Sequence, residues 1–157
     1  MSDELTVLRT IADYQFGTGA GNALFPPGDP PHITRSSGGR PRQLVSDGGR
    51  LVTLGQDGRF TLGYAGGHRL AQALAPPAYR VGVGDESVPF VADGSNAFAK
   101  FVRSADPTIR PGDEVLVVEG NELIGVGRAE LSATGMEDFD RGVAVSVREG
   151  RDEWHER

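Results

Sequence analysis

The first residues of the chain carry apolar side chains at helical spacing. The positions that share one helix face are Leu5, Leu8, Ala12 and Phe16. Ser2 is suited to the N-cap, and the acidic Asp3 and Glu4 favour the positive end of the helix dipole. Gly17 is suited to a left-handed C-terminal cap. The pattern therefore predicts a helix that ends at about residue 16.

After a proline-rich connector, the chain changes to short apolar runs separated by glycine-rich turns. The runs cover residues 32–36, 41–46, 50–55 and 59–63. Because the Gly-Gly and Asp-Gly pairs between them accept the positive φ angles of tight hairpin turns, we expect an antiparallel four-stranded meander. Residues 64–75 then predict a short helix with Leu70 and Leu74 facing inward, which Pro76 and Pro77 end.

The second half of the chain shows another series of short elements. We expect strands over residues 79–83, 88–91, 114–118, 122–131 and 142–148. Helices are expected over residues 97–102, with Ser95 or Asn96 as the cap, and over residues 135–139. The polar residues after Gly150 are expected to be frayed.

The composition excludes several kinds of chemistry. The chain has no cysteine, and the spacing of its three histidines does not resemble a metal site, so we expect no metal and no cofactor. No apolar run approaches the roughly 18 residues that span a membrane. The N-terminus is acidic where a signal peptide would be basic, so we expect a cytoplasmic protein.

The net charge of −6 argues at first sight against a nucleic-acid partner. The charge is unevenly distributed, however. Residues 1–78 carry seven arginines against six acidic residues, whereas residues 79–150 carry seven basic against thirteen acidic residues. The acid excess is therefore local to the second half, and a basic face is compatible with it.

Four separated segments between Val88 and Glu149 resemble a PUA domain. They are Pro89–Val102, Ile109–Val115, Ile124–Ala129 and Gly142–Val145. Their order matches a glycine loop before a short helix, a Pro-Gly-Asp turn, a glycine-containing strand and a closing Gly-Val-Ala-Val strand. The resemblance implies a β pseudo-barrel that binds structured RNA rather than DNA, with the loop and the helix lining the RNA cleft.

The first half resembles the domain that precedes the PUA domain in archaeal archaeosine tRNA-guanine transglycosylases. The matching segments are Ile11–Gly21, Leu24–Phe25, Gly38–Arg42 and Asp57–Leu62. The large catalytic barrel of those enzymes has no counterpart in these 157 residues. The resemblance therefore covers only the tRNA-binding region of those enzymes.

Together these patterns predict an α+β protein of two domains. Residues 1–77 are expected to form a transglycosylase C2-like domain, built from a helix and an antiparallel β-meander. Residues 78–150 are expected to form a PUA-type β pseudo-barrel, followed by a polar tail over residues 151–157.

The glycine loop of the second domain is the first candidate binding site. A helix that starts after Gly94, Ser95 and Asn96 would turn its N-terminus and backbone N–H groups towards a phosphate; the alternative is an ordinary turn with an N-cap. Lys100 and Arg103, one turn apart on that helix, are candidates for RNA contact, or else form a solvated helix face.

A second candidate is the hairpin that carries Arg35, Arg40 and Arg42 without any acidic residue. The planar arginine fork matches phosphate oxygens, although charged hairpin tips are commonly only solvated. The glycines at positions 17, 19 and 21 follow a helix rather than a strand, which argues against a dinucleotide-binding motif.

The remaining aromatic and acidic residues add no further site. Tyr79 and the phenylalanines at positions 90, 98, 101 and 139 suggest base stacking, as in proteins that bind single-stranded nucleic acid. Their neighbours are apolar and their spacing follows the predicted elements, so most of them are expected in the core. The acidic pairs are adjacent in sequence rather than convergent, so no active site is predicted.

Two functions follow from these features. The first is non-catalytic binding of tRNA, at its acceptor-stem region as the resemblance implies, in connection with a modification carried out by another polypeptide. The alternative is a protein-interaction subunit that docks onto a separate tRNA-modifying enzyme; the acidic second half favours it and the arginine hairpin disfavours it.

Overall fold

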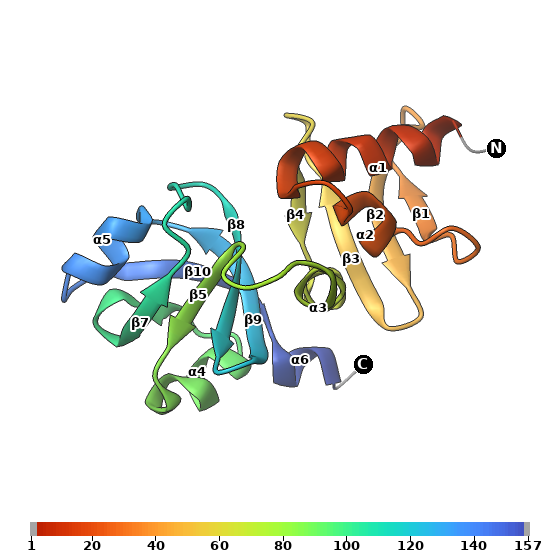
Figure 1. Cartoon of the computed structure of the whole chain (residues 1–157). Coiled ribbons are helices and arrows are strands. Elements are labelled where there is room, and N and C mark those ends of the chain that lie inside the picture. Colours follow the sequence, from red (N-terminus) through yellow and green to blue (C-terminus); the bar gives the residue numbers. More distant parts are fainter. Residues whose placement is uncertain (1–2, 156–157) are drawn as a thin grey trace. The chain divides into compact units, whose positions relative to one another are not determined.

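The computed structural model describes residues 3–155, and the chain divides into two compact units, residues 1–74 and 75–157 (Figure 1). Each unit has a helical part and its own antiparallel or mixed sheet. Within the described residues, no helix combines the length and the apolar character needed to cross a membrane.

The first unit begins with helix α1 (Asp3–Phe16). Its buried face consists of three of the four predicted positions, Leu8, Ala12 and Phe16. The helix ends at Gly17, whose φ of 109° is left-handed and whose N–H donates to the Asp13 carbonyl at 2.8 Å. The predicted helix and its glycine cap are thus confirmed, while the predicted N-cap Ser2 lies outside the described residues.

Helix α2 (Ala20–Leu24) packs closely against α1. A Cβ on Gly21 would lie 2.4 Å from the Arg9 carbonyl oxygen, so only glycine allows this approach. The Gly21 N–H also donates to the Asp13 carboxylate at 2.7 Å. These contacts give Gly21 a packing role between two helices.

The predicted meander forms a four-stranded antiparallel sheet in the order β1-β2-β3-β4. Its strands are β1 (His32–Arg35), β2 (Pro41–Ser46), β3 (Gly49–Leu54) and β4 (Phe60–Leu62). Leu44, Val52 and Leu62 face one another across three strands and are buried. Helix α3 (Tyr64–Ala73) follows, with Leu70 buried as expected.

The second unit is a nearly closed pseudo-barrel of six strands in the order β6-β10-β9-β8-β5-β7. The strands are β5 (Arg80–Val83), β6 (Ala97–Phe98), β7 (Val102–Ala105), β8 (Glu114–Glu119), β9 (Glu122–Ala129) and β10 (Val143–Gly150). β5 and β8 are parallel, and the other neighbours are antiparallel. The predicted pseudo-barrel is therefore confirmed.

The barrel interior is filled by small and branched apolar side chains. Val81, Val117, Ile124 and Val145 are fully buried in it. Helix α5 (Ala133–Asp138) adds the buried Met136, and the Ser132 hydroxyl caps its first turn by accepting the Gly135 N–H at 3.1 Å.

Two predicted elements of this unit are wrong. Residues 88–91, predicted as a strand, belong to helix α4 (Val88–Ala92), which follows the 3₁₀ turn η1 (Asp85–Ser87). Pro89 lies in the first turn of α4, where backbone N–H groups have no acceptor within the helix, so the lack of an N–H on proline costs no hydrogen bond. The predicted helix over 97–102 is instead β6, the 3₁₀ turn η2 (Ala99–Phe101) and the start of β7.

The polar end of the chain forms helix α6 (Arg151–His155), where a frayed tail was predicted. Arg151 pairs with Glu122 of β9 at 2.6 Å. Glu153 accepts the Gly150 N–H at 2.8 Å. These two contacts hold α6 to the end of the pseudo-barrel.

Candidate nucleic-acid interface

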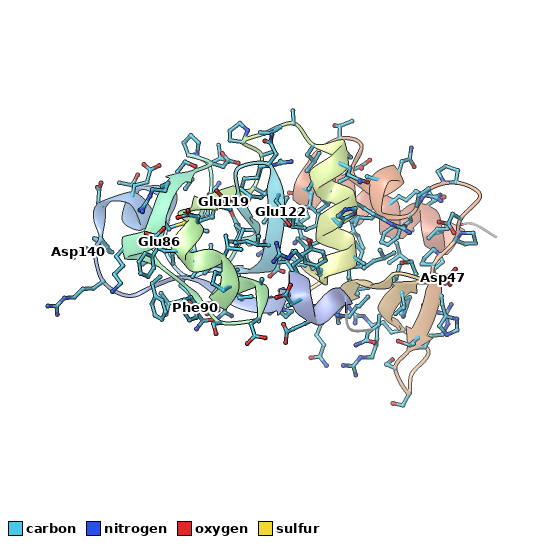
Figure 2. All side chains as sticks on the ribbon, turned by 90° about the horizontal axis from the view of Figure 1, so that it is seen from below. Asp47, Glu86, Phe90, Glu119, Glu122 and Asp140 are labelled. Carbon is cyan, nitrogen blue, oxygen red and sulfur yellow. The ribbon has the colours of Figure 1, made fainter. Side chains whose placement is uncertain are left out.

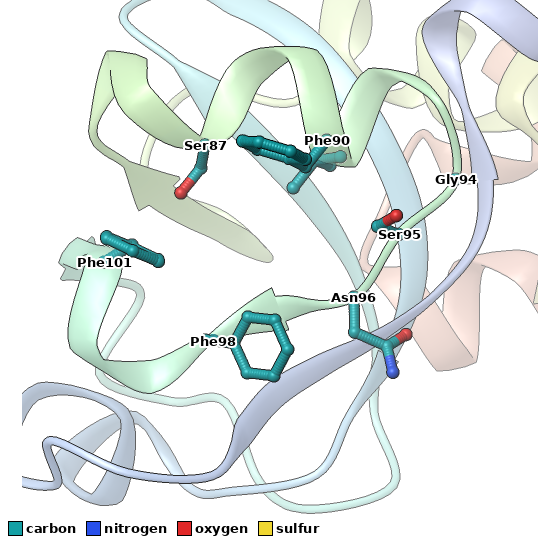
Figure 3. Close-up of a pocket in the computed structure, with 8 residues that line it drawn as sticks. Ser87, Phe90, Gly94, Ser95, Asn96, Phe98 and Phe101 are labelled. Carbon is teal, nitrogen blue, oxygen red and sulfur yellow. The ribbon is translucent and has the colours of Figure 1, made fainter.

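An open cleft of about 650 Å³ lies between α4 and the β6–η2 segment (Figure 3). Its walls combine three aromatic rings with small polar residues. It is lined by Ser87, Phe90, Val91, Gly94, Ser95, Asn96, Phe98 and Phe101. The structure thus brings the predicted residues Gly94, Ser95 and Asn96 together with side chains that were predicted to be core.

The phenylalanines of this cleft are exposed, which corrects their assignment to the core. Phe90 is 63% exposed and Phe98 is 45% exposed, while Phe101 is half-buried. Phe98 faces outward because the side chains alternate along β6, and its neighbours Ala97 and Ala99 are buried. Phe90, labelled in Figure 2, projects from the side of α4 that faces the cleft, across from Phe98 (Figure 3).

A signal for these exposed rings exists in the sequence, although it was missed. The small residues Ala97 and Ala99 flank Phe98, and this alternation of small and large apolar residues is compatible with an outward-facing ring. The alternation has no meaning in a helix, which is the element predicted for these residues. Phe139, outside the cleft, is likewise exposed, at 55%.

The glycine loop is the C-terminal end of α4 and does not precede a helix. Gly94 has a φ of 100°, and its N–H donates to the Val91 carbonyl at 2.9 Å. The Ser95 N–H donates to the Phe90 carbonyl, also at 2.9 Å. Both N–H groups are thus used within the protein, so the expected helix N-terminus that would cradle a phosphate is absent here.

Two further contacts fix this loop from the side of β10 and α6. A Cβ on Gly94 would lie 2.7 Å from the Oε1 atom of Glu153, so the glycine makes room for this carboxylate. The Asn96 Oδ1 accepts the Val147 N–H at 3.0 Å and ties the loop to β10. The loop is therefore held as a rigid edge of the cleft.

The two predicted cations of this region do not share a helix face. Lys100 lies in η2, where its Nζ is 5.0 Å from the centroid of the Phe101 ring, within the range of a cation–π contact. Arg103 lies on β7, and its guanidinium pairs with Glu86 at 2.8 Å. Lys100 is thus beside the cleft, whereas Arg103 is neutralised by a carboxylate.

Acidic residues also adjoin residues of the cleft. Glu86 precedes Ser87, Asp93 precedes Gly94, and Glu153 touches Gly94. Figure 2 shows other acidic side chains of this unit, among them Glu119, Glu122 and Asp140. The cleft therefore offers aromatic faces and hydrogen-bonding groups more than positive charge.

The predicted arginine hairpin belongs to the first unit, and its three arginines differ. Arg35 forms a bidentate pair with Glu4 at 2.8 and 2.9 Å. The hydrogen bonds between them raise the pKa of Arg35 and lower the pKa of Glu4. Arg40 donates to the Gly55 carbonyl of the β3–β4 turn, and Arg42 is exposed on β2.

No cluster that could ligate a metal is found in the part of the chain that the structure describes. Three or more His, Cys, Asp or Glu side chains nowhere converge within residues 3–155. The arrangement around the cleft is suited to binding an aromatic, hydrogen-bonding ligand.

The two units match two known families. Residues 79–151 match the PUA domain, and residues 6–77 match the patch-forming domain C2 of tRNA-guanine transglycosylase. The first unit therefore matches a transglycosylase-type C2 domain and the second unit matches a PUA domain, in the order that the sequence predicts.

Curated relatives support this assignment. The tRNA-guanine(15) transglycosylase of Pyrococcus furiosus is 45% identical over 148 residues, which cover 93% of this chain and 25% of the enzyme. The corresponding enzyme of Thermoplasma volcanium is 42% identical over 97% of this chain and 24% of its own length. This chain therefore spans about a quarter of the length of the curated relatives it matches.

Solved structures show the same fold. A hypothetical protein from Pyrococcus horikoshii superposes with a TM-score of 0.68 at 18% identity, over 96% of this chain and 91% of that one. A conserved PUA domain protein from Thermoplasma acidophilum superposes with a TM-score of 0.63 at 20% identity, over 95% and 89% of the two chains.

Proposed function

We propose that this protein binds RNA through the cleft between α4 and β6, and that its partner is tRNA. The observation that carries the proposal is the exposure of Phe90 and Phe98 in a cleft that also contains the Gly94 loop. Proteins that recognise unpaired RNA stack its bases on exposed aromatic rings and contact their edges with hydrogen-bonding groups.

The charges around the cleft support bases rather than phosphates as its ligands. Of the two predicted cations of this region, Arg103 pairs with Glu86, and Lys100 has its ammonium over the Phe101 ring. The Glu153 carboxylate lies against Gly94, and Asp93 precedes Gly94 in the sequence. Phosphate contacts are assigned to the predicted cations Lys100, Arg103, Arg35, Arg40 and Arg42 in this proposal. Among these, Arg42 and Lys100 are the best placed, because Arg103 and Arg35 pair with carboxylates.

Transfer RNA is the proposed partner because the curated relatives are named for tRNA. Within tRNA, we assign the acceptor-stem region to this chain, with its unpaired end in the aromatic cleft. Residues 78–150 would act as the PUA domain and residues 1–77 as the C2 domain, with residues 151–157 as a terminal extension. The proposal places the protein in the cytoplasm with its tRNA.

The proposed role is non-catalytic and assists a tRNA modification carried out by another polypeptide. The described residues contain neither a cluster suited to a metal nor convergent acid–base groups in the cleft. The chain also matches only a quarter of its transglycosylase relatives. Binding and orienting the tRNA would be its contribution.

A second candidate is a subunit that docks onto a separate tRNA-modifying enzyme. The acid excess of residues 79–150 favours it, because like charges repel RNA. The exposed Phe90 and Phe98 would then be buried by a protein. Co-purification after nuclease treatment separates the candidates, since a stoichiometric protein partner that survives the treatment supports the subunit.

The test of the first candidate is binding of the purified chain to bulk tRNA, compared with a Phe90→Ala/Phe98→Ala variant. Loss of base stacking costs about 1–3 kcal/mol per stacked base. We expect the variant to bind tRNA at least fivefold more weakly, with an unchanged slope of affinity against salt, because no charge is removed.

A Phe139→Ala variant is the matched control, since Phe139 is similarly exposed but does not line the cleft. It should bind tRNA like the wild type, and circular dichroism should show all three proteins folded. Equal tRNA affinity of the cleft variant and the wild type would rule out the aromatic cleft. Absence of tRNA binding by the folded wild type would make the docking subunit the better candidate.

A further inference from the structure

A second groove, in the first unit, has the composition of a nucleotide-binding surface. It has a volume of about 490 Å³ and lies between α1 and the turn that joins β3 to β4. Its lining residues are Thr10, Ile11, Tyr14, Gln15, Gly58 and Arg59. Tyr14 is 94% exposed, which is unusual for a large aromatic side chain.

The walls of this groove are fixed by hydrogen bonds. The Gln15 amide donates to the Phe60 carbonyl and accepts the Phe60 N–H, each at 2.8 Å, so α1 is joined to β4 directly beside Tyr14. In the turn, the Asp57 carboxylate accepts the Arg59 N–H at 3.0 Å, and Gly58 has a φ of 82°. The ring of Tyr14 and the side chain of Arg59 thus extend from rigid backbone.

Arginines gather at this turn. Arg59 lines the groove, and the Arg40 guanidinium donates to the Gly55 carbonyl of the same turn. An arginine fork beside an aromatic face is the combination that binds a phosphate and the base attached to it.

We propose that this groove binds an unpaired nucleotide of RNA, with its base stacked on Tyr14 and its phosphate on Arg59. The inference rests on the proposed function in that the ligand is RNA. The groove is nevertheless formed by other residues than the aromatic cleft and belongs to the C2 unit. RNA fits this groove better than a protein does, because the groove combines an arginine with an exposed aromatic ring. A nucleotide supplies a phosphate for the arginine and a base that stacks on the ring.

The test is binding of the full chain to bulk tRNA by Tyr14→Ala, Tyr14→Phe, Arg59→Ala and Arg59→Lys variants. Tyr14→Ala should lower the affinity roughly 5- to 100-fold, whereas Tyr14→Phe keeps the ring and should bind within about twofold of wild type. Arg59→Ala should reduce the salt slope by about 0.7–0.9, and Arg59→Lys should restore it, because lysine also neutralises one phosphate.

A Val7→Ala variant is the control for general loss of apolar surface on α1. Val7 is 58% exposed on the same helix and does not line the groove. Its variant should bind tRNA normally. If Val7→Ala weakens binding as much as Tyr14→Ala does, the helix surface as a whole is responsible and the nucleotide site is wrong.

The outcomes separate this site from the cleft of the PUA unit. Wild-type affinity in both Tyr14→Ala and Arg59→Ala, together with weakened binding in Phe90→Ala/Phe98→Ala, would overturn the groove and leave the proposed function standing. If the folded wild type does not bind tRNA at all, the groove and the proposed function are both wrong. Cross-linking of 4-thiouridine-containing tRNA to the α1 peptide would support the groove directly.

Discussion

The carboxylate of Glu153 lies against the backbone of Gly94, where a Cβ would come within 2.7 Å of Oε1. The same oxygen accepts the Gly150 N–H at 2.8 Å. A residue of the last helix therefore supports the loop at the edge of the aromatic cleft. The absence of a side chain at position 94 is explained by this contact and by its φ of 100°.

We expect Gly94→Ala to destabilise the PUA unit by about 1–3 kcal/mol, because alanine is strained at this φ. Urea unfolding followed by circular dichroism measures the effect. A Gly94→Ala/Glu153→Ala variant removes the steric conflict and retains the strain, and it is compared with Glu153→Ala alone, because both lack the Gly150 hydrogen bond. If the double variant is as stable as Glu153→Ala, the carboxylate contact rather than the backbone angle requires glycine.

Asp106 stabilises the start of the PUA unit through its ionised form. The buried carboxylate accepts hydrogen bonds from the Tyr79 N–H at 2.8 Å, the Thr108 N–H at 3.0 Å and the Thr108 hydroxyl at 2.9 Å. Burial by itself would raise the pKa of Asp106, but these hydrogen bonds together lower it. The hydrogen bond from the Tyr79 N–H joins Asp106 to a residue whose φ of 60° is unusual.

Asp106→Asn should therefore lower the free energy of unfolding at pH 7 by about 1–3 kcal/mol, because the amide offers a donor where acceptors are needed. Since the folded pKa lies below the unfolded value of about 3.9, the contribution is present above that pH and is lost as the pH falls through the folded pKa. The difference between variant and wild type should shrink in urea unfolding at pH 3. Asp140→Asn, on an exposed loop, should show no such difference at either pH.

The ion pair with Glu4 occupies the Arg35 guanidinium and so limits its contact with RNA phosphates. Both side chains are nearly half exposed. We expect Glu4→Gln to raise the affinity for bulk tRNA, because it releases one guanidinium and removes one negative charge. The unfolding midpoint should change little, since exposed ion pairs are screened by water.

Glu137→Gln removes the same charge from an exposed position in α5 and is the control for net charge. If both variants raise the affinity equally, the effect comes from total charge and Arg35 has no particular role. If Glu4→Gln leaves the affinity unchanged, Arg35 does not contact the RNA.

Arg42 and Lys100 are the predicted phosphate contacts that can be removed with the least structural damage. Arg40 is excluded from this test because it supports the Gly55 carbonyl. If both exposed residues contact phosphates, Arg42→Ala/Lys100→Ala should make the salt slope of tRNA affinity shallower by about 1.5. Arg42→Lys, which retains the charge, should keep the wild-type slope; an unchanged slope in the double variant would place the phosphate contacts elsewhere.

Elements whose signals are local were predicted well. The apolar spacing of α1, the glycine cap at Gly17 and the hairpins of the β1–β4 sheet all depend on residues within a few positions of one another. The pseudo-barrel was recognised because several separated motifs agreed in order. Its loop residues Gly94, Ser95 and Asn96 line the cleft, in a different local structure from the predicted one, and their contact with RNA stays a prediction.

Elements that depend on distant partners were not predicted. Residues 97 and 98 form a strand because they pair with Val145 and Val143 of β10, almost fifty positions away. That pairing turns Phe98 outward and separates Lys100 from Arg103. A potential capping side chain, Asn96, is likewise used by the distant Val147 N–H.

Local sequence patterns specify the two-part α+β organisation, the hairpins and the composition of the candidate loop, because turn chemistry and hydrophobic period act over short distances. The exposure of the aromatic rings and the pairing of the arginines depend instead on tertiary packing. Phe90 and Phe98 line a cleft, and Arg35 meets Glu4 across 31 positions, because chain segments far apart in sequence pack side by side. The exposure and charge of a side chain in a binding site depend on those packed neighbours, which no local pattern specifies.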